Sequence, residues 1–309
     1  MGIENKYYLT VNILSFNRKE LLRQNLTNLV KFNSVKLKII VVDNGSTDGT
    51  VEMIQSNFPE VELIALESNI GISAWNYGFK ELTTDYCLVL DDDTLISEKS
   101  LVDLLEFTFK NNCDIVYPKN INPITGTDFT IDCPFGIILF WGCCVLISKK
   151  IITSLKGFDK NIFIWEHELE FSIRALGRGF KIAHVSDIIC YHFSGANSSK
   201  TVRNNKFNTQ IRNHFYITAK FFTGWYKILI MINLIVKIIL ASIKNGYHFK
   251  LPKTLYKAYK LGKMNRVEIP FEIQKIYKDN YIFFVSPLYL KIKYSLRAKF
   301  YEDRKKYYP

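Results

Sequence analysis

Several familiar signatures are absent from this 309-residue sequence. Its six cysteines stand at positions 87, 113, 133, 143, 144 and 190, and none forms a Cys-x-x-Cys pair or a zinc-binding spacing. Most of them lie in apolar runs, where a free cysteine behaves as a small hydrophobic residue, so we expect a reducing compartment. No Gly-x-Gly-x-x-Gly follows the first apolar run, which disfavours a dinucleotide-dependent oxidoreductase.

Two further signals are missing near the N-terminus. The opening residues lack the apolar stretch of a signal peptide, so we expect a cytoplasmic protein. A basic, glycine-rich triphosphate loop is also absent, which disfavours a nucleotidyltransferase. Internal repeats and low-complexity linkers are not found either. A composition that is 48% hydrophobic and 15% aromatic supplies a core for one large α/β domain with an appendage, or for two medium domains.

The net charge of +12 is unevenly distributed along the chain. Residues 244–309 contain 16 Lys and Arg against 5 Asp and Glu, a net of +11. Residues 1–243 contain 25 against 24, a net of +1. A nearly neutral body therefore carries a basic tail, which predicts a polyanionic partner, either an anionic membrane surface or a nucleic acid.

The first two thirds of the chain alternate between short apolar runs and amphipathic segments. We expect strands at residues 7–16, 35–43, 61–67, 86–90, 137–147 and 180–192. We expect helices at residues 19–32, 72–82, 97–110 and 165–179, with Ser97 as the cap of the third and Ser46 or Thr47 capping another helix after residue 47. This rhythm predicts an α/β fold in which helices cover both faces of a mostly parallel sheet.

Polar clusters follow four of the predicted strands and begin at Ser15, Asp43, Asn69 and Asp91. Because the carboxyl ends of parallel strands meet at one edge, these clusters should form one ligand site. Asp43 could accept hydrogen bonds from a nucleotide base or a ribose, or could only shape a turn.

The triplet Asp91-Asp92-Asp93 is the sharpest of these signals, because adjacent carboxylates repel one another. On an extended chain Asp91 and Asp93 point the same way and can face one hard cation such as Mn²⁺ or Mg²⁺. The alternative is a solvated loop in which one aspartate caps the next helix.

An ordered set of motifs resembles the family 2 inverting glycosyltransferases of the GT-A fold. The motifs are "VNILSFNRKELL", "IIVVDNGSTDGT", "NIGISAWNYGF", "LVLDDDT", "WGCCVLISKKIITSLKGFD", "WEHELEFSIRALGRGF" and "YHFSG". The resemblance covers about residues 8–215. It implies a Rossmann-like, mostly parallel sheet in a catalytic domain at 1–215, with a nucleotide-sugar half at 1–117 and an acceptor half at 118–215. Residues 216–309 would form a basic, mainly helical extension.

The resemblance also implies roles for individual residues. It assigns contacts with the donor nucleotide, its ribose or its diphosphate to Ser15, Asn17, Arg18, Asp43, Asn69, Gly71, Asp91 and Asp92. It implies an Mn²⁺ or Mg²⁺ cofactor with Asp93 as the most direct ligand, Asp91 beside it, and His192 of "YHFSG" near the metal and diphosphate. Taken alone, a histidine such as His192 is more often structural than a metal ligand, and within this motif the two roles are equally favoured.

The catalytic motif departs from the usual family pattern. Counting back from Arg174 places Glu168 where family members carry an aspartate base, and His167 replaces the preceding glutamate. Glutamate can abstract the same proton with one more methylene of reach. A shifted register would use Glu166 instead. We interpret Glu170 and Arg174 as an i,i+4 ion pair.

The resemblance implies transfer of a hexosyl or deoxyhexosyl group from a UDP- or dTDP-sugar. The acceptor would be a hydroxyl of a glycan or lipid-linked glycan in bacterial surface polysaccharide synthesis, and "QIRNHFY" leans toward rhamnose or similar sugars. The alternative is a membrane- or nucleic-acid-binding module whose GT-A domain is catalytically degenerate.

The apolar run at residues 221–243 is interrupted by lysines. At about 100° per residue, Lys220, Lys227, Asn233, Lys237 and Lys244 fall within one arc of about 140°. This pattern favours a helix lying in the membrane interface, with its lysines toward the headgroups. A transmembrane span and a helix docked on the catalytic domain are the alternatives. Since no named nucleic-acid motif occurs, we expect peripheral association with the inner face of the cell membrane and no nucleic-acid partner.

Overall fold

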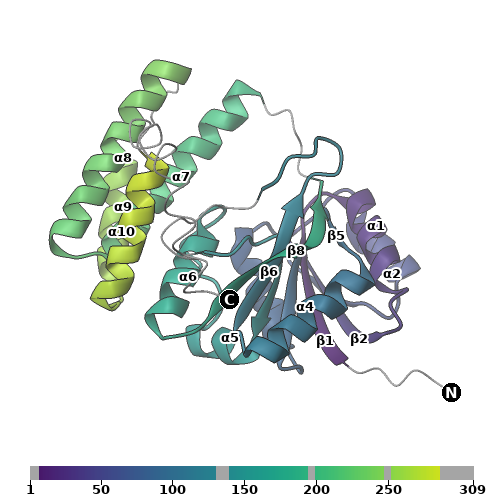
Figure 1. Ribbon diagram of the computed structural model, residues 1–309. Coiled ribbons are helices and arrows are strands. Elements are labelled where there is room, and N and C mark those ends of the chain that lie inside the picture. Colours follow the sequence, from purple (N-terminus) through teal and green to yellow (C-terminus); the bar gives the residue numbers. More distant parts are fainter. Residues whose placement is uncertain (1–6, 130–138, 194–198, 247–251, 286–309) are drawn as a thin grey trace. The chain divides into compact units, whose positions relative to one another are not determined.

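The computed structural model describes residues 7–129, 139–193, 199–246 and 252–285 (Figure 1). The chain divides into two units. The first contains residues 1–133 and 137–200, and the second contains residues 134–136 and 201–309.

The first unit is built on an eight-stranded sheet in the order β3-β2-β1-β4-β7-β6-β8-β5. The strands are β1 (Tyr7–Ser15), β2 (Val35–Asp43), β3 (Glu62–Ala65), β4 (Tyr86–Asp91), β5 (Thr94–Ile96), β6 (Ile115–Ile121), β7 (Cys144–Ser148) and β8 (Ile182–His192). The pairings leave β5 and β7 antiparallel to their neighbours, while the others run in one direction. The prediction of a mostly parallel sheet is therefore confirmed.

Helices pack on both faces of this sheet and close two apolar cores. The helices are α1 (Lys19–Leu29), α2 (Thr50–Asn57), α3 (Trp75–Lys80) after the 3₁₀ turn η1 (Gly71–Ala74), α4 (Glu98–Asn111), α5 (Lys149–Leu155) and α6 (His167–Gly177). One core joins the sheet to α1, α2 and α4, and the other joins it to α3, α5 and α6. This two-faced packing is what the alternating sequence predicts.

The strand register brings distant polar residues to one edge. Ser15 pairs with Asp43 at the ends of β1 and β2, and Leu14 pairs with Asp91 across β1 and β4. The short strand β5 pairs antiparallel with β8, which puts Thr94 opposite His192. Sequence reasoning did not find β5, because three residues are too few to show a period.

Two predicted helix caps had different outcomes. Ser97 caps α4 as expected, since its hydroxyl accepts a hydrogen bond from the Ser100 amide at 3.0 Å. The prediction that Ser46 or Thr47 caps α2 was wrong. Gly49 is the N-cap, with φ 84° and no side-chain cap. The Ser46 hydroxyl instead accepts from the Asn17 amide at 2.9 Å and so ties the loop after β2 to the loop after β1.

The second unit is helical where it is described. Its helices are α7 (Lys200–Phe221, whose first residue still belongs to the first unit), α8 (Gly224–Asn245), α9 (Pro252–Met264) and α10 (Phe271–Val285). Placing Lys220 on one helix with Lys227 and Lys237 was wrong, because the chain breaks at Thr223 and Lys220 is buried in α7. The Gln274 side chain secures the break by accepting from the Thr223 amide at 3.2 Å. Among the described residues, α8 alone is long and apolar enough to cross a membrane by length and composition.

Candidate active site

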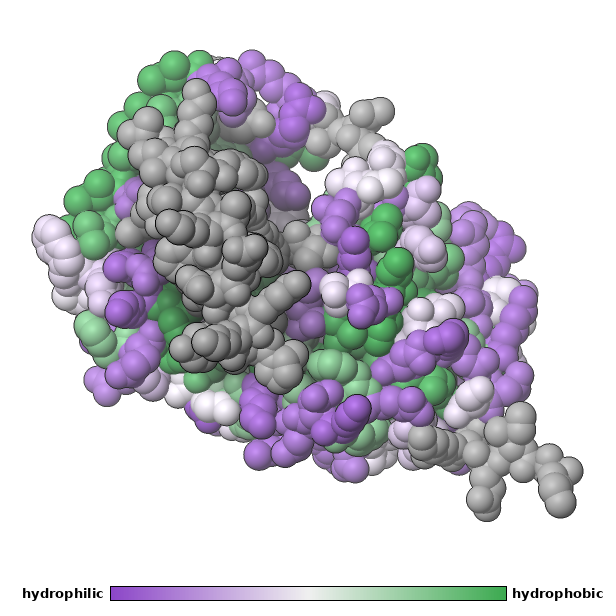
Figure 2. Space-filling view, viewed as in Figure 1, coloured by the Kyte–Doolittle hydropathy of each residue, from purple (hydrophilic) through white to green (hydrophobic). Residues whose placement is uncertain are grey.

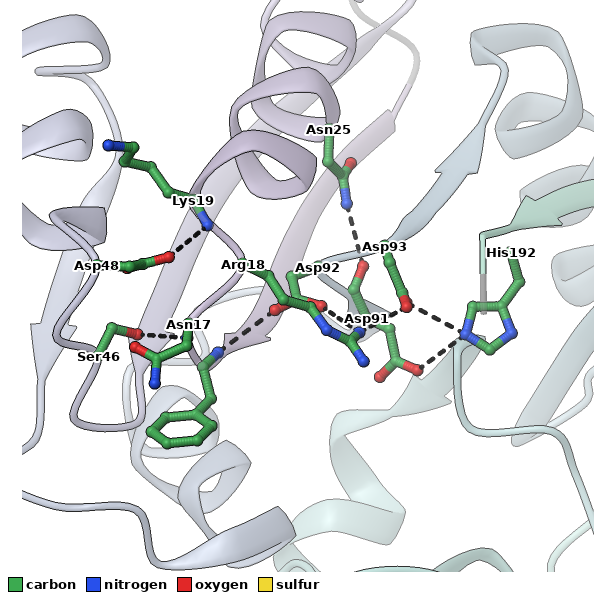
Figure 3. Close-up of polar contacts among 11 residues, drawn as sticks. Asn17, Arg18, Lys19, Asn25, Ser46, Asp48, Asp91, Asp92, Asp93 and His192 are labelled. Atoms are coloured by element: carbon green, nitrogen blue, oxygen red, sulfur yellow. Dashed lines mark hydrogen bonds and ion pairs between the residues drawn. The ribbon is translucent and has the colours of Figure 1, made fainter. Parts of the chain in front are cut away.

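Two carboxylates and an imidazole converge beyond the carboxyl end of β4 (Figure 3). The potential ligand atoms of Asp91, Asp93 and His192 all lie within 4.8 Å of one another. His192 Nε2 is 3.2 Å from Asp93 Oδ1 and 3.8 Å from Asp91 Oδ2. The pairing of β5 with β8 holds this geometry, and the Phe193 amide donates to the Asp93 carbonyl at 2.9 Å. This donor set, mostly carboxylate oxygen, fits a small divalent cation such as Mn²⁺ or Mg²⁺.

Arg18 lies against the same aspartates. Its Nη1 donates to Asp92 Oδ1 at 3.0 Å and to Asp93 Oδ2 at 2.5 Å. The Phe16 amide donates to the other oxygen of Asp92 at 3.3 Å. Both aspartate side chains are almost fully buried, whereas the Arg18 side chain is 48% exposed. The loop after β1 therefore supplies positive charge to the loop after β4.

Burial and mutual repulsion make this triplet electrostatically unfavourable. Burial, together with repulsion from Asp93 and Asp92, raises the pKa of Asp91 well above its ordinary value. Burial raises the pKa of Asp92 to about 6 despite the attraction of Arg18. Burial also acts on Asp93, but contact with His192 and the charge of Arg18 hold its pKa below the ordinary value. A bound divalent cation would relieve this crowding.

The neighbouring strand end carries a second buried carboxylate. Asp43 is 1% exposed, and its Oδ2 accepts from the Ser46 amide at 2.9 Å. Its Oδ1 receives no hydrogen bond from the described residues. This arrangement suits a ligand that donates an N–H or O–H group. Asn69 plays an internal part, because its Oδ1 accepts from Asn44 Nδ2 at 3.0 Å and from the Gly71 amide at 2.8 Å.

Gly71 allows two segments to approach closely. It has φ 71°, and a Cβ there would lie 2.1 Å from the Phe163 carbonyl oxygen. That carbonyl accepts from the Ile72 amide at 2.8 Å. Since Phe163 lies just before α6, this contact fixes the approach to the helix that carries the predicted base.

The predicted base is in the first turn of α6. The Glu168 side chain is 20% exposed, and its Oε2 is 3.2 Å from His167 Nδ1. Its charge adds to the raised pKa of Asp91, so the two carboxylates are electrostatically coupled. Burial lowers the pKa of His167 to about 3, which keeps that imidazole neutral. Gly142 leaves room for the carboxylate, because a Cβ there would lie 2.9 Å from Glu168 Oε1.

The other two glutamates of this segment differ from Glu168. Glu170 is fully buried, and both its oxygens accept from Arg174 at 2.7 Å. Arg174 also donates to the Leu155 and Gly157 carbonyls at 2.6 and 3.0 Å. The interpretation of Glu170 and Arg174 as an ion pair is therefore confirmed. Glu166 precedes the helix as its N-cap, in the left-handed conformation with φ 63°.

Comparison with known families identifies the core of the first unit. Residues 10–142 match the family described as Glycosyl transferase family 2. This part of the chain is a family 2 glycosyltransferase domain. Over 107 residues the chain is 29% identical to the poly-β-1,6-N-acetyl-D-glucosamine synthase of Staphylococcus aureus, covering 34% of this chain and 26% of that protein. A synthase of the same name from Staphylococcus epidermidis is 29% identical over 100 residues, 31% of this chain and 24% of that protein. The chain thus matches about a quarter of the length of these relatives.

Two solved structures have a fold similar to that of this chain. The mannosyltransferase PcManGT from Pyrobaculum calidifontis, in complex with GDP-Man and Mn²⁺, aligns with a TM-score of 0.57 and 14% identity over 97% of this chain and 87% of that one. TarS 1–349 of S. aureus, in complex with UDP-GlcNAc, aligns with a TM-score of 0.58 and 16% identity over 89% of each chain. The predicted GT-A fold is confirmed.

The first unit brings some of the predicted site residues into direct contact and places the others on neighbouring segments. Asp91, Asp93 and His192 form the cluster, with Arg18 and Asp92 bonded to it. Ser15 and Asp43 end β1 and β2, Asn17 and Asn69 lie in loops, Gly71 begins η1, and Glu168 lies in the first turn of α6. Their individual contacts with a substrate stay predictions.

Sequence reasoning missed two supporting residues of the transferase domain. One is Gly142, described above. The other is Asn25, whose side-chain amide donates to the Asp91 carbonyl at 3.1 Å. Asn25 is a fully buried polar residue on the apolar face of α1, between Leu22 and Leu26. That break in the apolar pattern is the signal that could have revealed it.

Proposed function

We propose that this protein is an inverting glycosyltransferase that moves a hexosyl or deoxyhexosyl group from a UDP- or dTDP-sugar to a hydroxyl group. The acceptor is a glycan or a lipid-linked glycan. The observation that carries the proposal is the cluster of Asp91, Asp93 and His192 at the carboxyl edge of a family 2 domain, together with the charge of Glu168 acting on Asp91. The GDP-Man, Mn²⁺ and UDP-GlcNAc complexes of the structural relatives support a nucleotide-sugar donor and a divalent cation.

Asp91, Asp93 and His192 would hold Mn²⁺ or Mg²⁺, which when bound offsets the diphosphate charge and makes the nucleotide diphosphate a better leaving group. Asp43 offers its unbonded oxygen to the nucleotide. Glu168 accepts the proton of the acceptor hydroxyl as that oxygen attacks the anomeric carbon. The bond to the diphosphate breaks on the opposite face, so one displacement inverts the configuration. Neutral His167 leaves the negative charge of Glu168 available for this role.

The proposal places the reaction in surface polysaccharide synthesis at the inner face of the bacterial cell membrane. The similarity to poly-β-1,6-N-acetyl-D-glucosamine synthases supports a role in polysaccharide synthesis. The basic second unit and the apolar helix α8 support a location at the membrane.

A thermal-shift screen of UDP-, dTDP- and GDP-sugars, with and without Mn²⁺, tests the donor site. A ligand that binds only the folded state raises Tm, by several degrees at about 100 times Kd. We expect a UDP- or dTDP-sugar to raise Tm when Mn²⁺ is present, and Asp93→Ala to abolish the increase. Asp103→Ala, an exposed aspartate on α4, serves as the control. Absence of a shift with every nucleotide sugar would contradict the proposal.

Transfer itself needs a second measurement, because a degenerate domain could bind a donor without reacting. The stabilising nucleotide sugar is incubated with Mn²⁺ and a membrane extract that supplies acceptors, and released nucleotide diphosphate is measured. We expect release that Asp93→Ala and Glu168→Gln abolish. Donor binding without any release would favour the binding-module alternative.

A further inference from the structure

Helix α8 exposes a continuous row of large apolar side chains, here called the α8 stripe. It consists of Trp225, Ile228, Ile232, Ile235, Val236, Ile239, Leu240 and Ile243, each between 41% and 77% exposed. At about 100° per residue these positions fall within one arc of about 140°. Figure 2 shows hydrophobic side chains gathered along α8. Monomeric soluble proteins rarely leave such a patch uncovered unless something binds it.

The opposite side of α8 is already occupied within the second unit. Ile230 and Leu234 are fully buried. The Tyr226 ring stacks on Phe271 of α10, with ring centroids 5.0 Å apart. The ammonium group of Lys278, also on α10, lies 5.0 Å from the centre of the Tyr226 ring. A helix that crossed the membrane would have to leave α10 or carry Lys278 into hydrocarbon, so this packing argues against a span.

No lysine falls within the α8 stripe. At 100° per residue Lys227 and Lys237 project from the side that carries the buried Ile230 and Leu234, and the exposed Lys244 projects closer to the edge of the stripe. Helix α9 contains no acidic residue and exposes Lys253, Lys257, Lys260 and Lys263. Residues 201–309 contain 22 Lys and Arg against 5 Asp and Glu, a net of +17. Such a surface repels a second copy of itself and attracts an anionic one.

We propose that α8 lies parallel to the plane of an anionic bilayer. The α8 stripe enters the boundary between headgroups and acyl chains, and the exposed lysines of the unit, Lys244 and those of α9, contact lipid phosphates. Burial of the apolar α8 stripe and attraction of the lysines to anionic lipids both contribute to binding of the same membrane. The proposal extends the location given in the proposed function, and it stands on the geometry of α8 without reference to the reaction.

Vesicle flotation of the full chain tests this proposal. The vesicles are phosphatidylcholine alone, or an equimolar mixture of phosphatidylcholine and phosphatidylglycerol. We expect flotation with the anionic vesicles, weakened by high salt, and little with the neutral ones. The double substitution Ile235→Ser and Ile239→Ser should weaken binding at least about tenfold, because two large apolar side chains are lost. Ile124→Ser, an 81% exposed residue of the first unit, is the matched control.

Three results would overturn the proposal. The chain could fail to float with anionic vesicles, or the double variant could float as well as the wild type. Light scattering could instead show a stable dimer that the two serines dissociate, without vesicle binding, which would mean that a second copy covers the α8 stripe. An unchanged Tm of the double variant excludes misfolding. Stabilisation by a nucleotide sugar is unaffected by these outcomes, so the donor site is judged separately.

A second inference concerns Arg18 and rests on the proposed metal site. Its Nη1 bridges Asp92 and Asp93, and its half-exposed side chain has solvent into which it can swing. Asp93 Oδ2, the oxygen that Arg18 contacts at 2.5 Å, belongs to the most direct of the predicted metal ligands. We infer that Arg18 is the counter-ion of the cation-free aspartates and competes with the divalent cation for Asp93.

Calorimetric titration of nucleotide-free protein with Mn²⁺ tests this competition. Removing the competing positive charge should tighten Mn²⁺ binding by about tenfold in Arg18→Gln, whereas a purely attractive role for Arg18 in nucleotide binding predicts no such gain. Lys19→Gln is the control, because the Lys19 contact with Asp48 is made by its backbone amide. Equal or weaker Mn²⁺ binding by Arg18→Gln overturns the inference. If the wild type and Arg18→Gln both bind no Mn²⁺, both the inference and the proposed metal site fail.

Discussion

The two units depart from the usual distribution of side chains in opposite ways. Residues 1–200 contain 19 Lys and Arg against 24 Asp and Glu, a net of −5, and bury several of the charges, Asp92 and Asp93 among them. Residues 201–309 are strongly basic and expose apolar side chains such as Ile235 and Ile239. Buried charge and exposed apolar surface are both unfavourable without a partner. The comparison indicates what kind of ligand each unit binds: buried carboxylates in the first unit indicate a cation, and exposed apolar side chains in the basic second unit indicate an anionic, apolar surface.

Buried charges within the first unit are themselves of two kinds. Glu170 is satisfied inside the protein, because Arg174 bonds both its oxygens. The aspartate triplet keeps two raised pKa values even with Arg18 beside it. If this distinction is correct, substituting a buried charge that is paired inside the protein, such as Glu170, should reduce stability. Substituting an aspartate of the triplet should reduce function.

The largest expected effect is on catalysis. Glu168→Gln removes the proton acceptor but keeps the shape of the side chain, so kcat should fall by about 10²–10⁴-fold. Tm and nucleotide-sugar affinity should stay close to those of the wild type. Product formation at saturating donor gives the measurement. Near-normal turnover, together with a large loss in Glu166→Gln, would move the role of base to Glu166.

Glu170→Gln should show the reverse behaviour. It leaves the buried Arg174 without its charge partner, so the free energy of unfolding should fall by about 3–5 kcal/mol. Urea denaturation measures this change, and Glu168→Gln is the matched control on the same helix. A Glu170→Gln protein as stable as the wild type would remove the distinction between the two kinds of buried charge.

A third substitution tests the contact that positions α6. Gly71→Ala places a Cβ against the Phe163 carbonyl and forces a left-handed residue, so we expect a loss of about 2–4 kcal/mol. Gly126 has a similar φ of 68° but no atom within 4 Å of an added Cβ. Gly126→Ala should therefore lose only the conformational part, about 1–2 kcal/mol. Equal losses in the two variants would show that the contact with Phe163 does not matter.

The smallest predicted effect is a pH dependence from His167. Its pKa of about 3 in the folded state is far below that of an exposed histidine, because it is buried. Between pH 6.5 and 3 the unfolded chain binds a proton that the folded chain refuses, so stability falls as pH falls. Relative to His167→Gln, the wild type should lose about 1 kcal/mol per pH unit below about 6.5.

The comparison with His167→Gln is needed because Asp92 acts in the opposite direction. Its pKa of about 6 is raised by burial, so its contribution to stability falls as pH rises from about 4 to 6. Urea denaturation at several pH values, on both proteins, isolates the His167 contribution. Parallel pH curves for the two proteins would contradict the prediction.

The sequence predicted the parts of the site that depend on local pattern. Ser15, Asp43 and Asp91 end buried apolar runs, and parallel pairing then places them at one edge. His192 depends on a non-local event, since it reaches Asp93 through the pairing of β8 with β5. A three-residue strand such as β5 is too short to show a period in the sequence. The resemblance of "YHFSG" to the family motif therefore suggested that His192 lies near Asp93, whereas periodicity could not predict it.

The same limit applies to the second unit. The lysine arc was drawn through Lys220 because the apolar run looked continuous, whereas the backbone breaks at Thr223 and starts a new helix. Periodicity predicted one polar side and one apolar side for this helix. It could not predict that a second apolar side, at Ile230 and Leu234, would be used within the unit, because that depends on where α10 packs.

The turn before α6 places two consecutive residues, Trp165 and Glu166, in the left-handed conformation. Each such residue costs about 1–2 kcal/mol, which only the surrounding packing can offset. A glycine at either position would remove that strain and would also loosen the first turn of the helix. Methods that raise thermostability would favour glycine at Trp165 or Glu166 because it removes the strain. A design that aims to keep activity should leave both residues unchanged.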